Sequence, residues 1–474
     1  MKTRTHEALQ RRLALDQSER RLPSVVAGLI RGGELVWSGG AGSVAGDPAG
    51  VQYRCGSITK TFVAVQVMRL RDEGRLALSD PLERHLPGAF DGVTIAQLLT
   101  HTSGLRAETA GPWWERTSGG DFDDLVAASL HPTDLTAGEH PARLARPGQR
   151  FHYSNVGFAL LGELVARLRG MAWAQALQQD VLTPLGLTRT TLRPQAPSST
   201  GYAVHPYADV LVTEPEHDGG AMAPAGQLWT TVTDLARWAA FLRDGETGTE
   251  TGKVLAASTL REMREPQALD DRRGASWTGA HGLGLQIWNA DGMRSFGHGG
   301  SMPGFLAIMR IAADSGEGAV VMANATSGMR PAIAEELSRI LAEHEPAPVA
   351  AWTPAHPPEG TLSALGRWFW GPSAFTLRAN GSAELSLEPE PGGGRSARFH
   401  RTPGGTWIGQ DGYFTGETLR IRWTRQDGTR ADEPVALDLA SFIFTRTPYD
   451  PQADVPGGVD PQGWHVPDGP GELL

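Results

Sequence analysis

The hydrophobic pattern of the first 345 residues changes from strand-like to helical and back to strand-like. A charged amphipathic segment over 1–22 is followed by short β-branched runs, broken by glycine, that predict a hairpin over 25–37. Longer apolar runs without glycine or proline predict buried helices. The later elements follow in the order helices 61–70, 156–168 and 226–243, strands 283–288, 305–309 and 319–323, and a last helix 331–343. This order predicts one sheet built from both ends of the domain.

The remaining chain carries a different pattern. Prolines cluster over 346–360 and indicate a stiff linker. Alternating apolar and polar runs, separated by glycine-bearing turns, predict a small all-β domain, either a barrel or a sandwich, over 361–447. The segment 448–474 is rich in proline, glycine and aspartate and is expected to be irregular. We therefore expect domains at 1–345 and 361–447, joined by the linker and followed by the tail.

Composition narrows the classes of function. The 474 residues carry 43 basic and 53 acidic side chains, a net charge of −10, which argues against nucleic acid as a partner. No apolar run approaches a membrane span, and no signal peptide is visible, so we expect a cytoplasmic protein. The single cysteine, Cys55, excludes an intramolecular disulfide. The histidines lack zinc-ligand spacing, so no metal and no cofactor are expected. The oligomeric state is left open.

Ser57 and Lys60 lie three residues apart at the start of a predicted helix. Side chains at i and i+3 share one face of a helix, so the Lys60 amine can reach the Ser57 hydroxyl. A lysine held neutral by burial can take the proton of a serine and make it a nucleophile. The alternative interpretation of these two residues is a helix-capping serine with a surface lysine.

Two later segments carry further candidates. Tyr153 and Asn155 lie on the loop before the helix over 156–168, where side chains can face a cleft. A lysine nearby could lower the pKa of the Tyr153 phenol and let it shuttle protons, although packing beneath the helix is the alternative. The second segment lies between strand-like runs and consists of Gly297, His298, Gly299, Gly300 and Ser301. Its glycines leave the backbone open to a substrate, although a glycine-rich turn with a surface histidine is the alternative.

These three motifs, in this order, resemble those of the serine β-lactamase and penicillin-binding-protein superfamily. The resemblance is closest to the class C β-lactamase-like branch, which includes esterases and D-amino-acid peptidases, and it covers about residues 20–340. Three flanking segments agree with it: Leu98 to Leu105, Pro147-Gly148 and Pro184 to Leu187. The resemblance implies an α/β fold with a mixed sheet flanked by helices and a helical subdomain.

The resemblance also implies roles for the candidate residues. Ser57 would be the acylated nucleophile, Lys60 its general-base partner and Tyr153 the proton shuttle, with the choice of base between Lys60 and Tyr153 left open. Asn155 would orient the substrate or Lys60. The backbone amides of Ser57 and Ser301 would form the oxyanion hole.

One departure from the family affects the expected substrate. Members that recognise penicillin carry Lys-Thr-Gly at the third motif, where this chain has His298, Gly299 and Gly300. A histidine with an ordinary pKa of about 6.5 is mostly neutral at pH 7 and supplies no fixed cation for a substrate carboxylate. We therefore expect a serine hydrolase that acts through an acyl-enzyme on small-molecule ester, amide or D-amino-acid peptide substrates. The alternatives are β-lactamase or D-Ala-D-Ala carboxypeptidase activity, and a non-catalytic binding protein that keeps the fold.

Overall fold

The computed structural model divides the chain into two compact units, Met1–Ala347 and Pro348–Leu474. The residues that it describes are all those of the chain except 89, 91, 131–143, 245–253, 272–273, 291, 327, 350, 392–393, 425–428 and 449–474. The predicted irregular tail therefore lies, apart from Pro448, outside the described residues. Within the described part, no helix is both long and apolar enough to cross a membrane.

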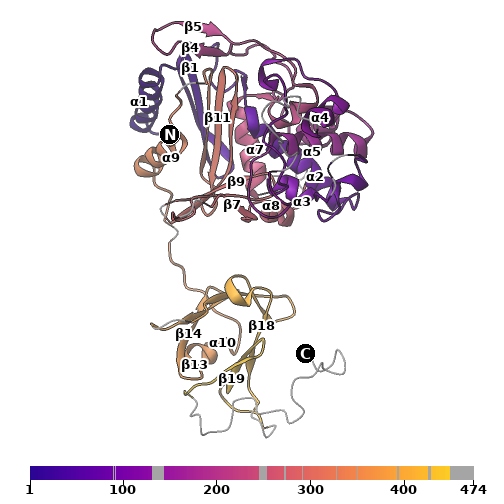
Figure 1. Cartoon of the computed structure of the whole chain (residues 1–474). Helices are drawn as coiled ribbons and strands as arrows, with labels where there is room; N and C mark the ends of the chain where they lie inside the picture. The colour runs from indigo at the N-terminus through magenta and orange to yellow at the C-terminus, as the bar shows by residue number, and fades with distance from the viewer. Residues whose placement is uncertain are drawn as a thin grey trace. The chain divides into compact units, whose positions relative to one another are not determined.

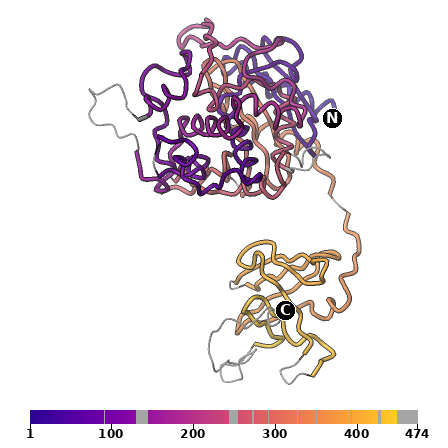
Figure 2. Tube along the Cα trace, turned by 90° about the vertical axis from the view of Figure 1, so that its right-hand side faces the viewer, coloured from indigo at the N-terminus to yellow at the C-terminus, as the bar shows by residue number. Residues whose placement is uncertain are grey.

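An eight-stranded sheet organises the first unit, with the strand order β2-β1-β12-β11-β10-β9-β8-β7. The early and late strands of this unit meet where β1, the second strand of the sheet, pairs with β12, the third, and Val26 lies opposite Met322. Indigo and orange strands accordingly lie side by side in Figures 1 and 2. The strands are β1 (Ser24–Arg31), β2 (Glu34–Gly42), β7 (Ala268–Leu269), β8 (Gly279–His281), β9 (Gln286–Ala290), β10 (Met293–Met302), β11 (Phe305–Ala312) and β12 (Gly318–Ala323).

This architecture confirms the predicted fold class, but the expectation of a mixed sheet is wrong in detail. Every strand pair of this sheet is antiparallel. Parallel neighbours need long crossover connections, whereas β7 to β12 follow one another through short turns. The helical middle of the chain is thus an insertion between β2 and β7, and it is not a crossover connection between two parallel strands.

Helices cover both faces of the sheet (Figure 1). On one face, α1 and α9 bury a cluster that includes Leu9, Val25 and Leu337. The helices of the insertion pack on the other face around a larger core that includes Phe62 and Phe158. The helices are α1 (Thr3–Glu19), α2 (Thr59–Asp72), α3 (Ile95–Leu99), α4 (Phe122–Leu130), α5 (Asn155–Arg169), α6 (Trp173–Leu177), α7 (Val232–Asp244), α8 (Ala257–Met263) and α9 (Ile333–His344).

Two predicted elements begin later than expected. The helix predicted over 226–243 starts at Val232, because residues Trp229–Thr230 form β6 and pair with β3 (Tyr53–Arg54). The Thr231 hydroxyl caps this helix by accepting a hydrogen bond from the Asp234 amide at 3.1 Å. The strand predicted over 283–288 starts at Gln286, since Gly284 takes a left-handed φ of 79°.

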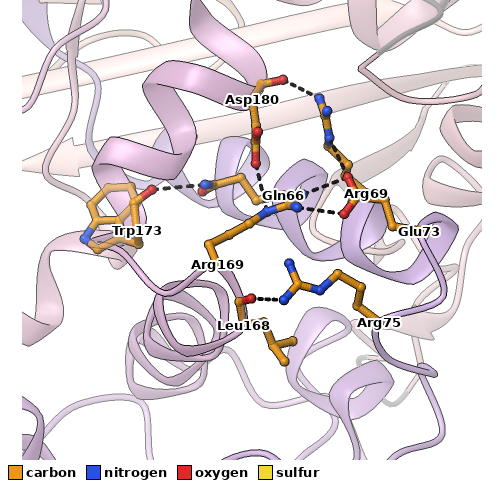
Figure 3. Close-up of polar contacts among 8 residues, drawn as sticks. All are labelled: Gln66, Arg69, Glu73, Arg75, Leu168, Arg169, Trp173 and Asp180. Carbon is orange, nitrogen blue, oxygen red and sulfur yellow. Dashed lines mark hydrogen bonds and ion pairs between the residues drawn. The ribbon is translucent and has the colours of Figure 1, made fainter.

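Charged side chains tie the far end of α2 to its neighbours (Figure 3). Arg69 donates to the Asp180 carbonyl oxygen at 2.6 Å and to the Glu73 carboxylate at 2.9 Å. Arg169, from the end of α5, binds Glu73 at 2.7 Å and the Asp180 carboxylate at 2.8 Å. Because one side chain bridges two acceptors in each case, the network fixes α2 against α5 and against the π-helical turn Gln178–Leu182.

The second unit is an antiparallel meander of eight strands in sequence order. The backbone of Phe369 exchanges two hydrogen bonds with Thr445, at 2.7 and 2.8 Å, and so brings the last strand back to the first. Of the two predicted forms, the domain is therefore the barrel, and its core includes Trp368 and Phe399. Its elements are α10 (Thr361–Ala364), β13 (Gly366–Trp370), β14 (Ser373–Asn380), β15 (Glu384–Pro389), β16 (Ala397–Arg401), β17 (Trp407–Gly409), β18 (Thr418–Arg422), β19 (Ala436–Leu439) and β20 (Phe442–Phe444).

We propose that the first unit folds without the second. A chain ended after Ala347 should unfold cooperatively and keep acylation of Ser57 by a small activated ester, because both hydrophobic clusters that pack the sheet lie in this unit. Differential scanning calorimetry and mass spectrometry of the labelled protein measure the two properties. A chain ended after Ala323, which lacks α9, is the control and should not fold. An insoluble or unlabelled protein ending at Ala347 would contradict the proposal.

Candidate active site

Ser57 and Lys60 lie where β3 turns into α2. Ser57 is in a 3-10 turn, Gly56–Ile58, and the α-helix itself begins at Thr59. Ser57 therefore lies just before the helix and not at its start, where the sequence predicted it. The Lys60 Nζ atom is 3.0 Å from the Ser57 Oγ atom, and Lys60 is fully buried. The spacing of these two residues therefore produces the contact expected of it, and the alternative of a surface lysine is wrong.

Lys60 has two further partners, and both are hydrogen-bond acceptors. Its Nζ atom lies 2.6 Å from the Ala225 carbonyl oxygen and 2.6 Å from the Asn155 Oδ1 atom. The Asn155 Nδ2 atom donates to the Glu108 carboxylate at 2.6 Å, which fixes the orientation of the amide. The Asn155 amide therefore contacts Lys60 in a fixed orientation.

The protonation state of Lys60 depends on its burial. Burial lowers the pKa of the Lys60 amine to about 7, against the opposing effect of the Glu108 and Glu115 carboxylates. A protein interior solvates an ammonium ion poorly, so the neutral amine is favoured. The lysine ammonium is consequently a strong enough acid for Lys60 to exist in both protonation states near neutral pH.

Tyr153 lies close to both Lys60 and Ser57. The Lys60 Nζ atom is 5.0 Å from the centroid of the Tyr153 ring. Burial raises the pKa of the Tyr153 phenol, and a hydrogen bond with Ser57 opposes this rise only in part. The expectation that the lysine lowers the pKa of Tyr153 is therefore wrong, because loss of solvation outweighs the effect of an amine that is itself only partly charged.

The third motif lies within strand β10 rather than in a turn between strands. Gly299 does not donate its amide to β11 but to the Gln286 Oε1 atom, at 2.8 Å. In an antiparallel pair the amide direction alternates, so the Ser301 amide points to the same side as that of Gly299. That side is the one on which Gly56 and Ser57 lie.

Two glycines allow this close approach. A Cβ atom on Gly56 would lie 2.4 Å from the Ser301 nitrogen, and one on Gly300 would lie 1.9 Å from the Cys55 carbonyl oxygen. The same Gly300 position is 3.2 Å from the Ser57 nitrogen. Any side chain at either glycine would push the two amides apart. The structure thus brings the Ser57 and Ser301 amides together beside the Ser57 hydroxyl.

His298 is buried, with a ring centroid 6.2 Å from that of Tyr153. Burial and the nearby Lys60 hold the pKa of His298 well below its ordinary value. The histidine is therefore neutral at pH 7, as expected from the sequence, and supplies no cation to the site.

The sequence reasoning missed several residues of the site. Glu108 lies on an irregular loop and Glu115 in the 3-10 turn Trp114–Arg116, whereas His101 follows α3 within one of the segments that resemble the family. The two glutamates have no sequence signal, because their relation to Lys60 is entirely a matter of tertiary structure. Burial raises the pKa of the Cys55 thiol to about 12, so Cys55 is not a competing nucleophile. Among the described residues, no group of three or more His, Cys, Asp or Glu side chains is arranged to hold a metal ion.

Comparison with known families agrees with this geometry. Residues 7–344 match the family described as Beta-lactamase. The chain belongs to the beta-lactamase family of serine hydrolases. Residues 357–446 match a separate family, a domain of unknown function (DUF7586), which corresponds to the barrel.

Individual relatives are distant. Penicillin-binding protein 4 of Amycolatopsis lactamdurans is 29% identical over 287 residues, which cover 57% of this chain and 72% of that protein. Protein flp of Staphylococcus aureus (strain COL) is 24% identical over 310 residues, which cover 62% of this chain but only 57% of flp. Neither relative is covered over its whole length.

Solved structures show the same fold. A D-stereospecific amidohydrolase from Streptomyces sp. superposes with a TM-score of 0.55 at 29% identity, over 72% of this chain and 99% of that one. The D-amino acid amidase of Ochrobactrum anthropi SV3, complexed with L-phenylalanine amide, gives a TM-score of 0.59 at 21% identity, over 72% and 99% of the two chains. The second similarity concerns the fold alone.

The pKa of Lys60 leads to a prediction for the pH dependence of acylation. Below pH 7 the amine is protonated and cannot take the serine proton, so labelling of Ser57 by a fluorophosphonate should accelerate as pH rises and level off above about 7. Glu108→Gln removes a charge that raises the pKa of Lys60 and should shift this curve to lower pH. Labelling rates measured from pH 5 to 9 test both effects.

The control for this experiment is Glu163→Gln, which removes a half-buried carboxylate on α5 that pairs with Arg167. This variant should leave the midpoint unchanged. A labelling rate that is independent of pH, or an equal shift in both variants, would contradict the assignment of the titrating group to Lys60.

Proposed function

We propose that this protein hydrolyses ester or amide bonds, those of D-amino-acid derivatives included, through an acyl-enzyme on Ser57. In this proposal Ser57 is the nucleophile and neutral Lys60 is its general base. Tyr153 donates a proton to the leaving group, Asn155 orients Lys60, and His298 with Gly299 and Gly300 lines the substrate edge. The Ser57 and Ser301 amides form the oxyanion hole.

The observation that carries the proposal is the set of partners around Lys60. A neutral amine has two hydrogens and one lone pair. The Ala225 carbonyl oxygen can only accept a hydrogen bond, and the Asn155 Oδ1 atom likewise accepts, so the two hydrogens are both engaged. The lone pair then faces the Ser57 hydroxyl at 3.0 Å, which is within reach for proton transfer. This arrangement supports Lys60, rather than Tyr153, as the base in the resting enzyme.

The raised pKa of Tyr153 supports a complementary role for the phenol. Because the phenol stays protonated at neutral pH, it can give a proton to a departing alcohol or amine. In this scheme the Ser57 oxygen attacks the carbonyl carbon and its proton passes to Lys60. As the bond to the leaving group breaks, Tyr153 protonates the leaving group and the proton held by Lys60 restores the phenol. The negative oxygen then faces two backbone amides, each of which contributes about 3 kcal/mol to transition-state stabilisation in enzymes of known mechanism.

The electrostatics of the site support substrates without a carboxylate. His298 is neutral, and the carboxylates of Glu108 and Glu115 act on Lys60 from the same region. A substrate carboxylate would meet these negative charges without a fixed cation at the third motif. The 29% identity to a D-stereospecific amidohydrolase supports amides of D-configuration as one substrate class.

A second candidate activity has its own support. The relative from Amycolatopsis lactamdurans is named a penicillin-binding protein, so acylation of Ser57 by a β-lactam is a plausible side reaction. Such acylation without rapid turnover would make the protein a penicillin-binding protein rather than a β-lactamase. Stoichiometric labelling by a fluorescent penicillin, with and without release over hours, distinguishes the two outcomes.

The roles of the three central residues lead to a joint prediction. Ser57→Ala should abolish turnover and fluorophosphonate labelling, while Lys60→Ala and Tyr153→Phe should each lower kcat by about 10²- to 10⁴-fold. Because the residues act as one unit, the Lys60→Ala/Tyr153→Phe double variant should lose far less than the product of the single losses. Labelling that survives in Ser57→Ala would falsify the assignment of Ser57 as the nucleophile and move that role to another residue.

Substrate preference is the second prediction of the proposal. Purified protein should turn over p-nitrophenyl acetate or butyrate, or a D-aminoacyl p-nitroanilide, with a higher kcat/KM than nitrocefin, because the site offers no cation to the cephalosporin carboxylate. The L-aminoacyl p-nitroanilide is the matched control for stereospecificity, and Ser57→Ala is the control for background hydrolysis. A kcat/KM for nitrocefin that equals or exceeds those of the esters would contradict this preference.

A further inference from the structure

The segment that carries Tyr153 has no regular secondary structure, and a single residue holds it from both sides. Residues 151–154 precede α5 and belong to no strand or helix. The His152 amide donates to the His101 carbonyl oxygen at 2.8 Å, and the Ser154 amide donates to the His101 Nδ1 atom at 3.0 Å. The amides before and after Tyr153 are thus both bound by His101, one through its backbone and the other through its side chain.

The His101 ring also contacts the Tyr153 ring directly. The two rings are stacked, with centroids 4.2 Å apart and an interplanar angle of 28°. Phe158 and His281 lie against other sides of the imidazole, with ring centroids at 5.1 and 5.0 Å. The imidazole is 1% exposed, so it has little room in which to turn. The His101 ring is itself held in place, and it packs against one face of the Tyr153 ring. It therefore limits the orientation of the Tyr153 side chain.

Two features of His101 lower the stability of the folded protein. Its backbone takes a left-handed φ of 57°, a region that residues other than glycine seldom adopt. Because Nδ1 accepts a hydrogen bond, the ring is neutral and carries its proton on Nε2. Within the described part of the chain, this buried Nε2 atom has no hydrogen-bond partner. Strained backbone and an unpartnered buried polar atom on one residue commonly mark a functional requirement.

We propose that His101 is a positioning residue that holds the Tyr153 phenol at Ser57 by clamping the backbone on both sides of Tyr153 and stacking on its ring. The inference rests on the proposed function, since it assigns to His101 an effect that acts through Tyr153. His101 itself need not contact the substrate. Its effect should therefore appear in the rate of the chemical step and disappear when the phenol is removed.

The test uses His101→Asn in the full chain. Asparagine tolerates a left-handed backbone and places its Oδ1 atom close to the position of Nδ1, so the Ser154 amide keeps an acceptor while the stacked ring is lost. The variant should lower kcat on p-nitrophenyl butyrate by about 10- to 100-fold, with a change in KM of less than about 3-fold. Rates are expressed per Ser57 labelled by fluorophosphonate, so a partly unfolded preparation does not imitate the effect.

A double-mutant cycle separates positioning from a general loss of structure. In the Tyr153→Phe background, which lacks the hydroxyl, His101→Asn should lower kcat further by less than about 2-fold. His101→Phe, which keeps a ring but loses the acceptor, should recover part of the rate lost in His101→Asn if stacking is the larger contribution. A loss that is fully additive with Tyr153→Phe, or an unchanged kcat with only a lower Tm, would overturn the proposal.

His205 provides a matched control. Its Nδ1 atom accepts the Tyr207 amide at 3.2 Å and its ring lies edge-on to that of Tyr207, but it belongs to the exposed hairpin of β4 (Tyr202–Val204) and β5 (Leu211–Thr213). His205→Asn makes the same chemical change and should leave kcat unaltered. An equal effect of the two substitutions would also overturn the proposal.

Failure of the proposed function gives a different result. Wild-type turnover and labelling that persist in Ser57→Ala, or a Tyr153→Phe variant as fast as the wild type, would remove the reaction or the phenol on which His101 is said to act. Either outcome overturns both proposals. A slow Tyr153→Phe variant beside a fast His101→Asn variant overturns only the role of His101.

Discussion

The burial of one amine governs the chemistry of the site and much of the structure around it. Lys60 is fully buried on α2, between the core of the helical insertion and the sheet, and loss of water is the first cause of its lowered pKa. An ammonium ion in such a place loses much of its solvation, so the neutral amine becomes accessible near pH 7. The Ala225 carbonyl oxygen and the Asn155 amide are fixed by the fold, and they leave the Ser57 hydroxyl as the third neighbour.

The second constraint is the contact between two segments that are distant in the sequence. The turn around Gly56 and the strand around Gly300 approach so closely that neither position has room for a side chain. The approach is possible because β1 and β10 to β12 belong to one sheet, which the early and late parts of the chain build together. The sheet thereby brings two backbone amides to the same side of Ser57, and the network at the far end of α2 keeps the helix in register with them.

Neutral aromatic and imidazole rings, rather than charges, form the wall opposite α2. His101, His281 and His298 all have lowered pKa values because of burial and, in each case, the neighbouring Lys60. Their neutrality is mutually consistent, since each charged ring would raise the energy of the others and of a protonated lysine. The negative charges near Lys60 are those of Glu108 and Glu115, which raise the pKa of its amine. Under the proposed function, a site of this kind would favour substrates whose acyl groups carry no charge.

The sequence by itself determined the local and periodic features of this protein. The spacing of Ser57 and Lys60 predicted that their side chains could touch, because residues i and i+3 lie on one face of a helical turn. It left open a surface lysine, and only the burial of Lys60 in the tertiary structure excluded that alternative. Periodicity likewise predicted the long helices, the hairpin at 25–37 and the all-β second domain. Only the tertiary structure decided the antiparallel pairing of the sheet, the strand at Trp229–Thr230 and the partners of Lys60. The tertiary structure also decided the direction of the Tyr153 pKa shift. Desolvation of a group depends on every segment that packs around it, and no local pattern in the sequence records those long-range neighbours.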